Sequence, residues 1–106
     1  MTAANLTAQL AQRVMKWDIA PERFIMGGRR WMPRSRFRPT ERIEDAFRLL
    51  EQAAPQDYTM GTDRSRVFWV KVTIGGTTAE ARGRSIASVI SHAVGLAVGI
   101  AVGSPD

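Results

Sequence analysis

RVFWVKVTIGGTTAEA, residues 66–81, is the most regular pattern in this 106-residue chain. Alternation of side chains over residues 66–74 has the period of a β-strand. One face of that strand is entirely apolar and consists of Phe68, Val70, Val72 and Ile74. The opposite face is mixed, which indicates partial cover. Gly75 and Gly76 can both take positive φ, as a two-residue hairpin turn requires, so we expect a return strand over residues 77–81.

Upstream of this hairpin, the sequence predicts a short edge strand from Tyr58 to Gly61 and two amphipathic helices. The first helix is expected from about Ala3 to Lys16, with apolar residues at four-residue spacing. The second is expected to begin at Thr40, a favourable N-cap residue, and to stop before Pro55. Its apolar stripe consists of Ile43, Ala46, Phe47 and Leu50.

A third helix is expected from Ile86 to about Val102, with Ser85 as its N-cap. The segment is apolar, but its seventeen residues fall short of the roughly 18–20 that a membrane span needs. We therefore expect a buried globular helix, with a membrane span as the alternative. A glycine inside a helix costs about 1 kcal/mol relative to alanine, which suggests that another backbone packs closely, within the chain or from a second copy. Three glycines lie four residues apart, and therefore on one face of such a helix: Gly95, Gly99 and Gly103.

Several local motifs resemble the phage ABA sandwich family of small phage-encoded proteins. They are MKW at residues 15–17, WMP at 31–33, PTERIEDAFRLLE at 39–51, and VFWVKVTIGGTTAEARGRSIASVISHA at 67–93. The resemblance covers most of the chain and implies an α+β fold arranged as a three-layer α/β/α sandwich, with a small antiparallel sheet flanked by about three helices. It also implies a phage or prophage origin. The arginine-rich segment lies outside the family pattern, so the family assigns it no role.

Composition limits the remaining possibilities. The length is that of a single domain, residues 1–106. The absence of cysteine excludes disulfides, thiolate metal sites and cysteine nucleophiles, and fits a reducing cytoplasm. The N-terminus lacks the features of a secretory signal. We therefore expect a protein of the host cell cytoplasm that is not inserted in a membrane.

Positive charge is concentrated in ERFIMGGRRWMPRSRFRPTE, residues 22–41. Six arginines lie between its terminal glutamates, whereas the whole chain has a net charge of +5. Arginine grips phosphate through a planar fork and stacks on rings, and Trp31 and Phe37 offer faces for a base. Gly27 and Gly28 permit a hairpin turn, and Pro33 and Pro39 bracket a stretch expected to be irregular and exposed. The candidate ligand-binding residues are Arg29, Arg30, Trp31, Arg34, Arg36 and Arg38.

The sequence contains few residues that could act in catalysis. The single histidine, His92, falls inside an apolar helix, where a core position is the simpler interpretation and ligand contact the alternative. Ser88 or Ser91 could pair with it, but nothing indicates an orienting group or an oxyanion hole. Glu44 and Asp45 are interpreted as helix surface charge. We expect no enzyme activity, no metal site and no cofactor.

Three functions remain in order of preference. The first is a phage accessory protein that sequesters a nucleotide-type immune signal of the host, with an oligomer completing its pocket. The second is a nucleic-acid-binding accessory protein whose arginines contact phosphates. The third is an inhibitor that binds a host protein whose surface has an acidic face. For the sequestration of a nucleotide-type signal, we expect a homo-oligomer.

Overall fold

The structure is a computed structural model that describes residues 2–102. It contains the following elements in chain order: α1 (Ala3–Arg13), β1 (Asp18–Ile19), β2 (Arg23–Gly27), β3 (Arg30–Pro33), a 3-10 turn η1 (Arg34–Arg36), α2 (Ile43–Ala53), β4 (Asp57–Thr62), β5 (Phe68–Ile74), β6 (Thr77–Gly83) and α3 (Ile86–Ala97). The expected α+β class, with an antiparallel sheet and three helices, is confirmed.

The larger sheet has the strand order β4-β5-β6, and all its pairs are antiparallel. Gly75 and Gly76 have φ of 58° and 82°, so the predicted two-residue turn is confirmed. Val70 and Val72 are fully buried on the apolar face of β5. On the opposite face the indole of Trp69 lies against Gly61, where a Cβ would come within 2.8 Å of the ring. Gly61 is therefore needed for this close approach.

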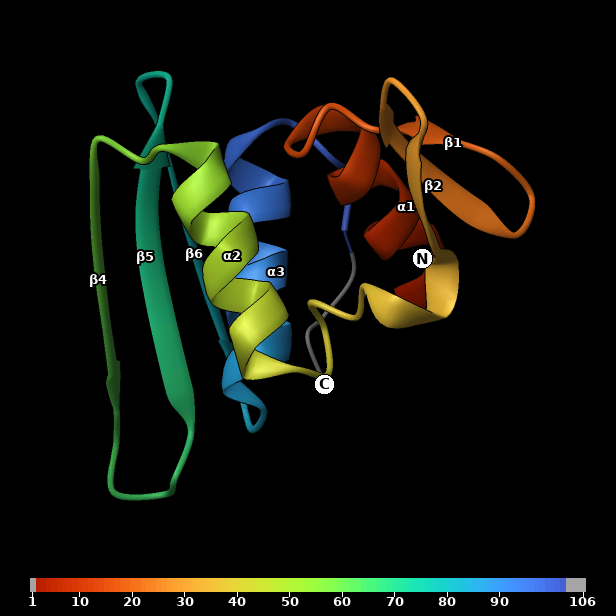
Figure 1. Ribbon diagram of the computed structural model, residues 1–106. Coiled ribbons are helices and arrows are strands. Elements are labelled where there is room, and N and C mark those ends of the chain that lie inside the picture. The colour runs from red at the N-terminus through yellow and green to blue at the C-terminus, as the bar shows by residue number, and fades with distance from the viewer. Residues whose placement is uncertain (1, 103–106) are drawn as a thin grey trace.

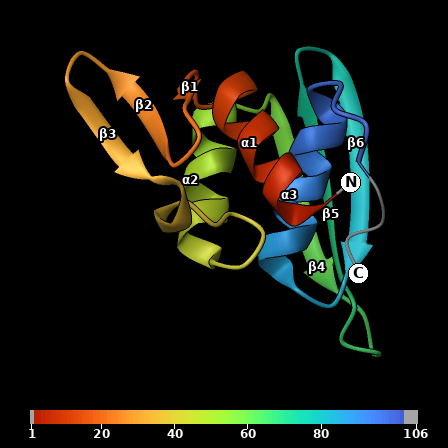
Figure 2. The ribbon, with the colours of Figure 1, turned by 90° about the vertical axis from the view of Figure 1, so that its right-hand side faces the viewer.

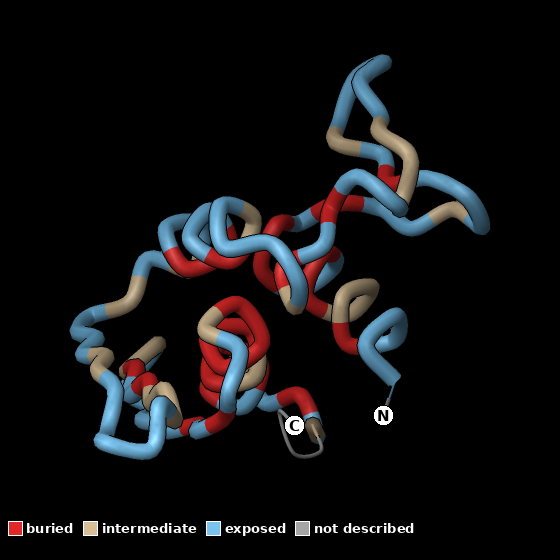
Figure 3. Tube along the Cα trace, turned by 90° about the horizontal axis from the view of Figure 1, so that it is seen from below, coloured by how far each residue is buried: buried red, intermediate tan, exposed pale blue. Residues whose placement is uncertain are grey.

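The layers can be followed from the larger sheet inward (Figure 1). Helix α3 packs against β5 and β6, and α2 packs beside α3. Helix α1 and the second sheet lie beyond this helix pair. Buried residues gather on α3 and on the surfaces that face it (Figure 3). The core thus lies between the larger sheet and α1.

The second sheet has the strand order β1-β2-β3. Its β2–β3 hairpin turns at Gly28 and Arg29, one residue later than the predicted pair of glycines, because Gly27 still belongs to β2 and pairs with Arg30 after a register shift. Gly27 and Gly28 both have positive φ, of 111° and 58°. Figure 2 shows this hairpin projecting away from the helices. Phe24 and Met32 are cross-strand partners that face the core side, whereas the paired Ile25 and Trp31 are exposed.

Helix α3 is shorter than the predicted segment. Ser85 caps it as expected, its hydroxyl accepting a hydrogen bond from the amide of Ser88. The helix ends at Ala97 because Gly99 takes a φ of 86° and stands just beyond the last turn. The amide of Ile100 then donates to the carbonyl of Gly95 at 2.8 Å. No helix among residues 2–102 has both the length and the apolar character to cross a membrane.

The predicted row of helical glycines is therefore wrong. Gly99 terminates the helix, and Gly103 lies outside the described residues. Only Gly95 is inside α3, and a Cβ there would lie 3.3 Å from Leu6 and 3.2 Å from Val102. Side chains of this chain, rather than another backbone, thus pack closely against Gly95.

Helix α2 also differs in detail from its prediction. It begins at Ile43, with Arg42 rather than Thr40 at the N-cap position and no side-chain cap. Its buried face consists of Ala46, Leu49 and Leu50. Ile43 and Phe47, predicted as core residues, are 45% and 40% exposed. Helix α1 likewise ends at Arg13 instead of Lys16, whose φ of 62° is not helical.

Candidate anion-binding site

A cavity of about 330 Å³ lies where the arginine-rich segment passes the N-terminal half of α1. Arg34 and Arg38 contribute the cations of this cavity, and Thr7, Ser35 and Thr40 contribute hydroxyl groups. Its full lining consists of Ala3, Ala4, Thr7, Phe24, Arg34, Ser35, Phe37, Arg38, Thr40 and Glu41. Two guanidinium groups and three hydroxyls, with the carboxylate of Glu41 beside them, form a surface suited to a small anion, while the rings of Phe24 and Phe37 lie beneath it and are each 1% exposed.

Burial of alternate residues fixes the arginine-rich segment in place. Phe37 is 1% exposed and packs with Trp17 and Phe24, at ring-centroid distances of 5.0 and 6.1 Å. Pro39 is fully buried, and its carbonyl accepts a hydrogen bond of 2.6 Å from the buried hydroxyl of Ser91 on α3. The expected irregular, exposed stretch between Pro33 and Pro39 is therefore wrong in part, since its apolar members belong to the core.

Arg34 is held by the loop between β1 and β2. Its backbone amide donates to the carbonyl of Glu22 at 3.1 Å, and its Nη1 donates to the carbonyl of Pro21 at 3.4 Å. Its guanidinium lies 5.5 Å from the centre of the Phe24 ring. These contacts use part of the donor set and leave the side chain half-buried at the cavity wall. A ligand would therefore meet a positioned cation.

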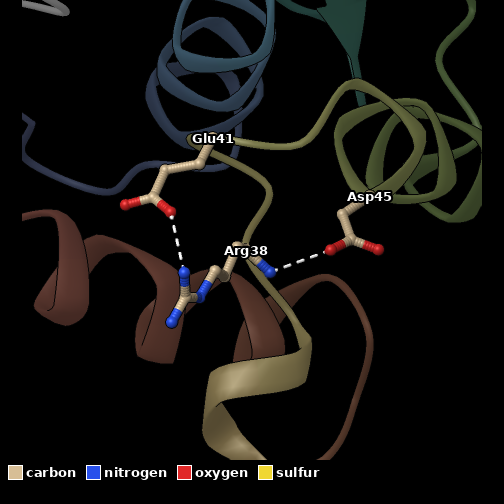
Figure 4. A network of polar contacts seen from close by, with 3 residues as sticks. All are labelled: Arg38, Glu41 and Asp45. Carbon is tan, nitrogen blue, oxygen red and sulfur yellow. Dashed lines mark hydrogen bonds and ion pairs between the residues drawn. The ribbon is translucent and has the colours of Figure 1, made fainter.

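Arg38 lies between two carboxylates (Figure 4). Its Nη1 lies 3.3 Å from Oε2 of Glu41, and its backbone amide donates to Oδ2 of Asp45 at 2.9 Å. The contact with Asp45 orders the approach to α2. The side chains of Arg38 and Glu41 are 48% and 62% exposed, so their ion pair is a weak one that an incoming anion can displace.

The other expected site residues lie elsewhere. Arg29 and Arg30 are exposed at the turn of the β2–β3 hairpin, and neither lines the cavity. Trp31 is 55% exposed on β3, with the guanidinium of Arg23 located 4.9 Å from its ring centre. Arg36 is exposed in η1 and also lies outside the cavity lining. The structure thus brings two of the six predicted residues together, rather than all of them.

Phe37 cannot present a ring face to a base, because that ring is buried in the aromatic cluster. The sequence interpretation of Phe37 as a stacking surface is therefore wrong. Trp31 keeps an exposed ring, and it forms a separate surface with Arg23 on the projecting hairpin.

The local contacts of His92 are those of a structural residue. Its Nδ1 lies 2.7 Å from the carbonyl oxygen of Ser88, to which it can donate, and 3.4 Å from the Ser88 hydroxyl. Ser91, the other serine considered, donates its hydroxyl to Pro39. Across residues 2–102, no three histidine or carboxylate side chains are grouped closely enough to hold a metal ion.

A crystal structure of a phage protein from Bacillus cereus ATCC 14579 resembles this chain, with a TM-score of 0.79. The match covers 97% of this chain and 93% of that one, at 17% sequence identity. No family model matches the chain, and no curated protein does. The fold is thus that of a small phage protein, while membership of the phage ABA sandwich family is not confirmed.

Several cavity residues were missed by the sequence interpretation. Ala3, Ala4 and Thr7 reach the cavity from α1, a contact between distant parts of the chain that local patterns cannot indicate. Thr40 and Glu41 were interpreted as a helix start, although they lie directly beside Arg38 in the sequence. Their position next to the arginines was the one signal that could have assigned them to the site.

Proposed function

We propose that this protein is a phage-encoded accessory protein that binds and sequesters a phosphate-bearing, nucleotide-type ligand in the host cytoplasm without chemically changing it. The observation that carries the proposal is the pairing of Arg34 and Arg38 at one cavity. Anchoring of the segment between them through Phe37 and Pro39 supports it, because a preorganised pair of cations loses less entropy on binding.

The size and chemistry of the cavity support a small ligand. Its volume lies near the lower end of the range for small-molecule sites, which suits a nucleotide-type molecule bound in part. The buried ring of Phe24 supports the guanidinium of Arg34, and the hydroxyls can orient a sugar or phosphate beside it. Sequestration requires this binding surface and no catalytic group.

Native mass spectrometry of the purified protein, followed by calorimetry with cyclic oligonucleotides and cyclic ADP-ribose isomers, tests this proposal. We expect stoichiometric binding of at least one ligand, which is recovered intact.

Arg38→Ala and Arg34→Lys should each weaken that binding by about tenfold or more, because a charged hydrogen bond is lost or misdirected. Arg36→Ala is the matched control, since Arg36 belongs to the same segment but lies outside the cavity. Absence of heat with every ligand, or an equal loss in the Arg36 variant, contradicts the proposal.

Nucleic-acid binding is the second candidate, and the β2–β3 hairpin favours it. This hairpin combines the exposed ring of Trp31 with the guanidinium of Arg23 and with Arg29 and Arg30 at its turn. An aromatic ring among arginines is typical of surfaces on which unpaired bases stack. Binding to single-stranded DNA or RNA should fall with salt, with a log–log slope of about 0.9 or less per neutralised phosphate. Arg30→Glu and Trp31→Ala should abolish retention in a gel-shift assay at low salt, whereas Arg38→Ala should have a smaller effect.

A further inference from the structure

Strand β4 forms an open edge of the larger sheet. It pairs with β5 on one side only, and no other strand in residues 2–102 pairs with it. Edge strands in monomeric proteins are commonly guarded by lysine, proline or a bulge. Between Asp57 and Thr62 this strand contains none of these, and its only charge is Asp57 at the start. The opposite edge, β6, carries the exposed, paired charges Glu80 and Arg82.

The direction of the edge amides follows from the hairpin turn. A two-residue turn at Gly75 and Gly76 makes Ile74 and Thr77 a hydrogen-bonded pair. Because this pattern alternates along a strand, residues 69, 71 and 73 of β5 direct their backbone groups toward β4. Residues 61, 59 and 57 of β4 are opposite them, so the backbone groups of these three residues are hydrogen-bonded to β5. The backbone N–H and C=O groups of Tyr58, Met60 and Thr62 therefore point outward.

Apolar side chains lie along the same edge. Phe47 of α2 is 40% exposed, and Tyr58 of β4 is 49% exposed. A hollow of about 290 Å³ separates α2 from β4, lined by Phe47, Leu50, Glu51, Pro55 and Tyr58. A partner strand added to β4 would therefore also meet an apolar helix surface.

We propose that β4 pairs with β4 of a second copy, antiparallel and across a two-fold axis, to form a continuous six-stranded sheet. The open edge requires an extended strand as its partner, and the chain itself supplies one whose outward backbone groups match. The centre of β4 is uncharged, so an antiparallel copy brings no like charges together there. The same axis places Phe47 of both copies on the same face of the joined sheet, which makes the interface self-complementary.

Amide hydrogen exchange at low and high protein concentration tests the strand pairing residue by residue. In the dimer, the amides of Tyr58 and Met60 should exchange about tenfold or more slowly than in the monomer. The amides of Thr59 and Gly61 bond to β5 and should be protected at both concentrations. Concentration-independent, fast exchange at Tyr58 and Met60 overturns the proposal.

Sedimentation equilibrium provides the second measurement. The wild-type chain of 11.7 kDa should approach twice that mass as concentration rises. Phe47→Glu and Met60→Pro should restore the monomer, since one charges the apolar surface and the other removes an outward N–H. Leu96→Glu, a control at a residue of similar exposure on α3, should remain dimeric. A monomeric wild type, or a dimer that persists in both variants with their melting temperatures retained, contradicts this interface.

Discussion

At the scale of single residues, Glu41 is the feature of the cavity with the most direct consequence. Its carboxylate forms an ion pair with the guanidinium of Arg38. A phosphate group is a stronger partner for arginine than a carboxylate that is more than half exposed. Glu41 therefore competes with any anion that enters the cavity, and its removal should favour binding.

We predict that Glu41→Gln raises the affinity for an anionic ligand by up to about fivefold, the limit set by an exposed ion pair. Calorimetry with inorganic pyrophosphate as a probe measures the change, and thermal melting should be almost unaffected. Glu44→Gln removes the same charge from α2 outside the cavity and serves as the control. A loss of affinity in the Glu41 variant would mean that this carboxylate positions Arg38 for the ligand instead of competing with it.

Only some members of the cavity could be predicted from the sequence. Arginine at positions 34 and 38 was predicted to contact a ligand, because arginine chemistry depends little on its surroundings. Burial of Phe37 was not predicted, because it depends on contacts with Trp17 and Phe24, which are distant in the sequence. Local pattern thus identifies which groups can bind, while long-range packing determines which of them meet.

At the scale of elements, strands were predicted better than helix ends. The alternation and glycine turn of residues 66–81 depend on local geometry alone, and the β5–β6 hairpin follows them closely. The C-terminal helix was predicted too long, since its apolar composition continues past the last turn. Gly99 could be an interior residue or a terminator, and only its φ of 86° distinguishes the two.

The two helix ends offer a matched pair of substitutions. Gly99 and Ala54 both have left-handed backbones, with φ of 86° and 50°, after α3 and α2 respectively. Gly99→Ala should destabilise the protein by about 1 kcal/mol, because a Cβ strains this conformation. Ala54→Gly should stabilise it by about 0.5–1 kcal/mol for the same reason. Urea unfolding at 25 °C measures both, and changes of equal sign would contradict this account.

At the scale of the whole molecule, one aromatic cluster connects elements that are far apart in the sequence. Trp17 follows α1, Phe24 belongs to β2, and Phe37 follows η1, with ring centroids 5.0–6.1 Å apart. Arg48 of α2 places its guanidinium 5.3 Å from the Trp17 ring. The small sheet, the arginine-rich segment, α1 and α2 therefore meet at this cluster.

This arrangement predicts opposite behaviour for two tryptophans. Trp17→Ala should cost about 3–5 kcal/mol, because Trp17 is 6% exposed and its loss leaves a cavity in the core. Trp31→Ala should change stability by less than about 0.5 kcal/mol, since its side chain is 55% exposed on the projecting hairpin. Chemical denaturation followed by circular dichroism compares them. A large cost for Trp31 would show that the hairpin is part of the cooperative core.

The anchoring of Phe37 and Pro39 also bears on how this scaffold could be changed. Because both residues are held in the interior, the solvent-facing positions between and before them can be randomised without altering the backbone that presents them. A library that varies the exposed residues 35, 36 and 38 should yield a high proportion of soluble variants. Selection from that library against other charged small molecules would provide new receptors on the same frame.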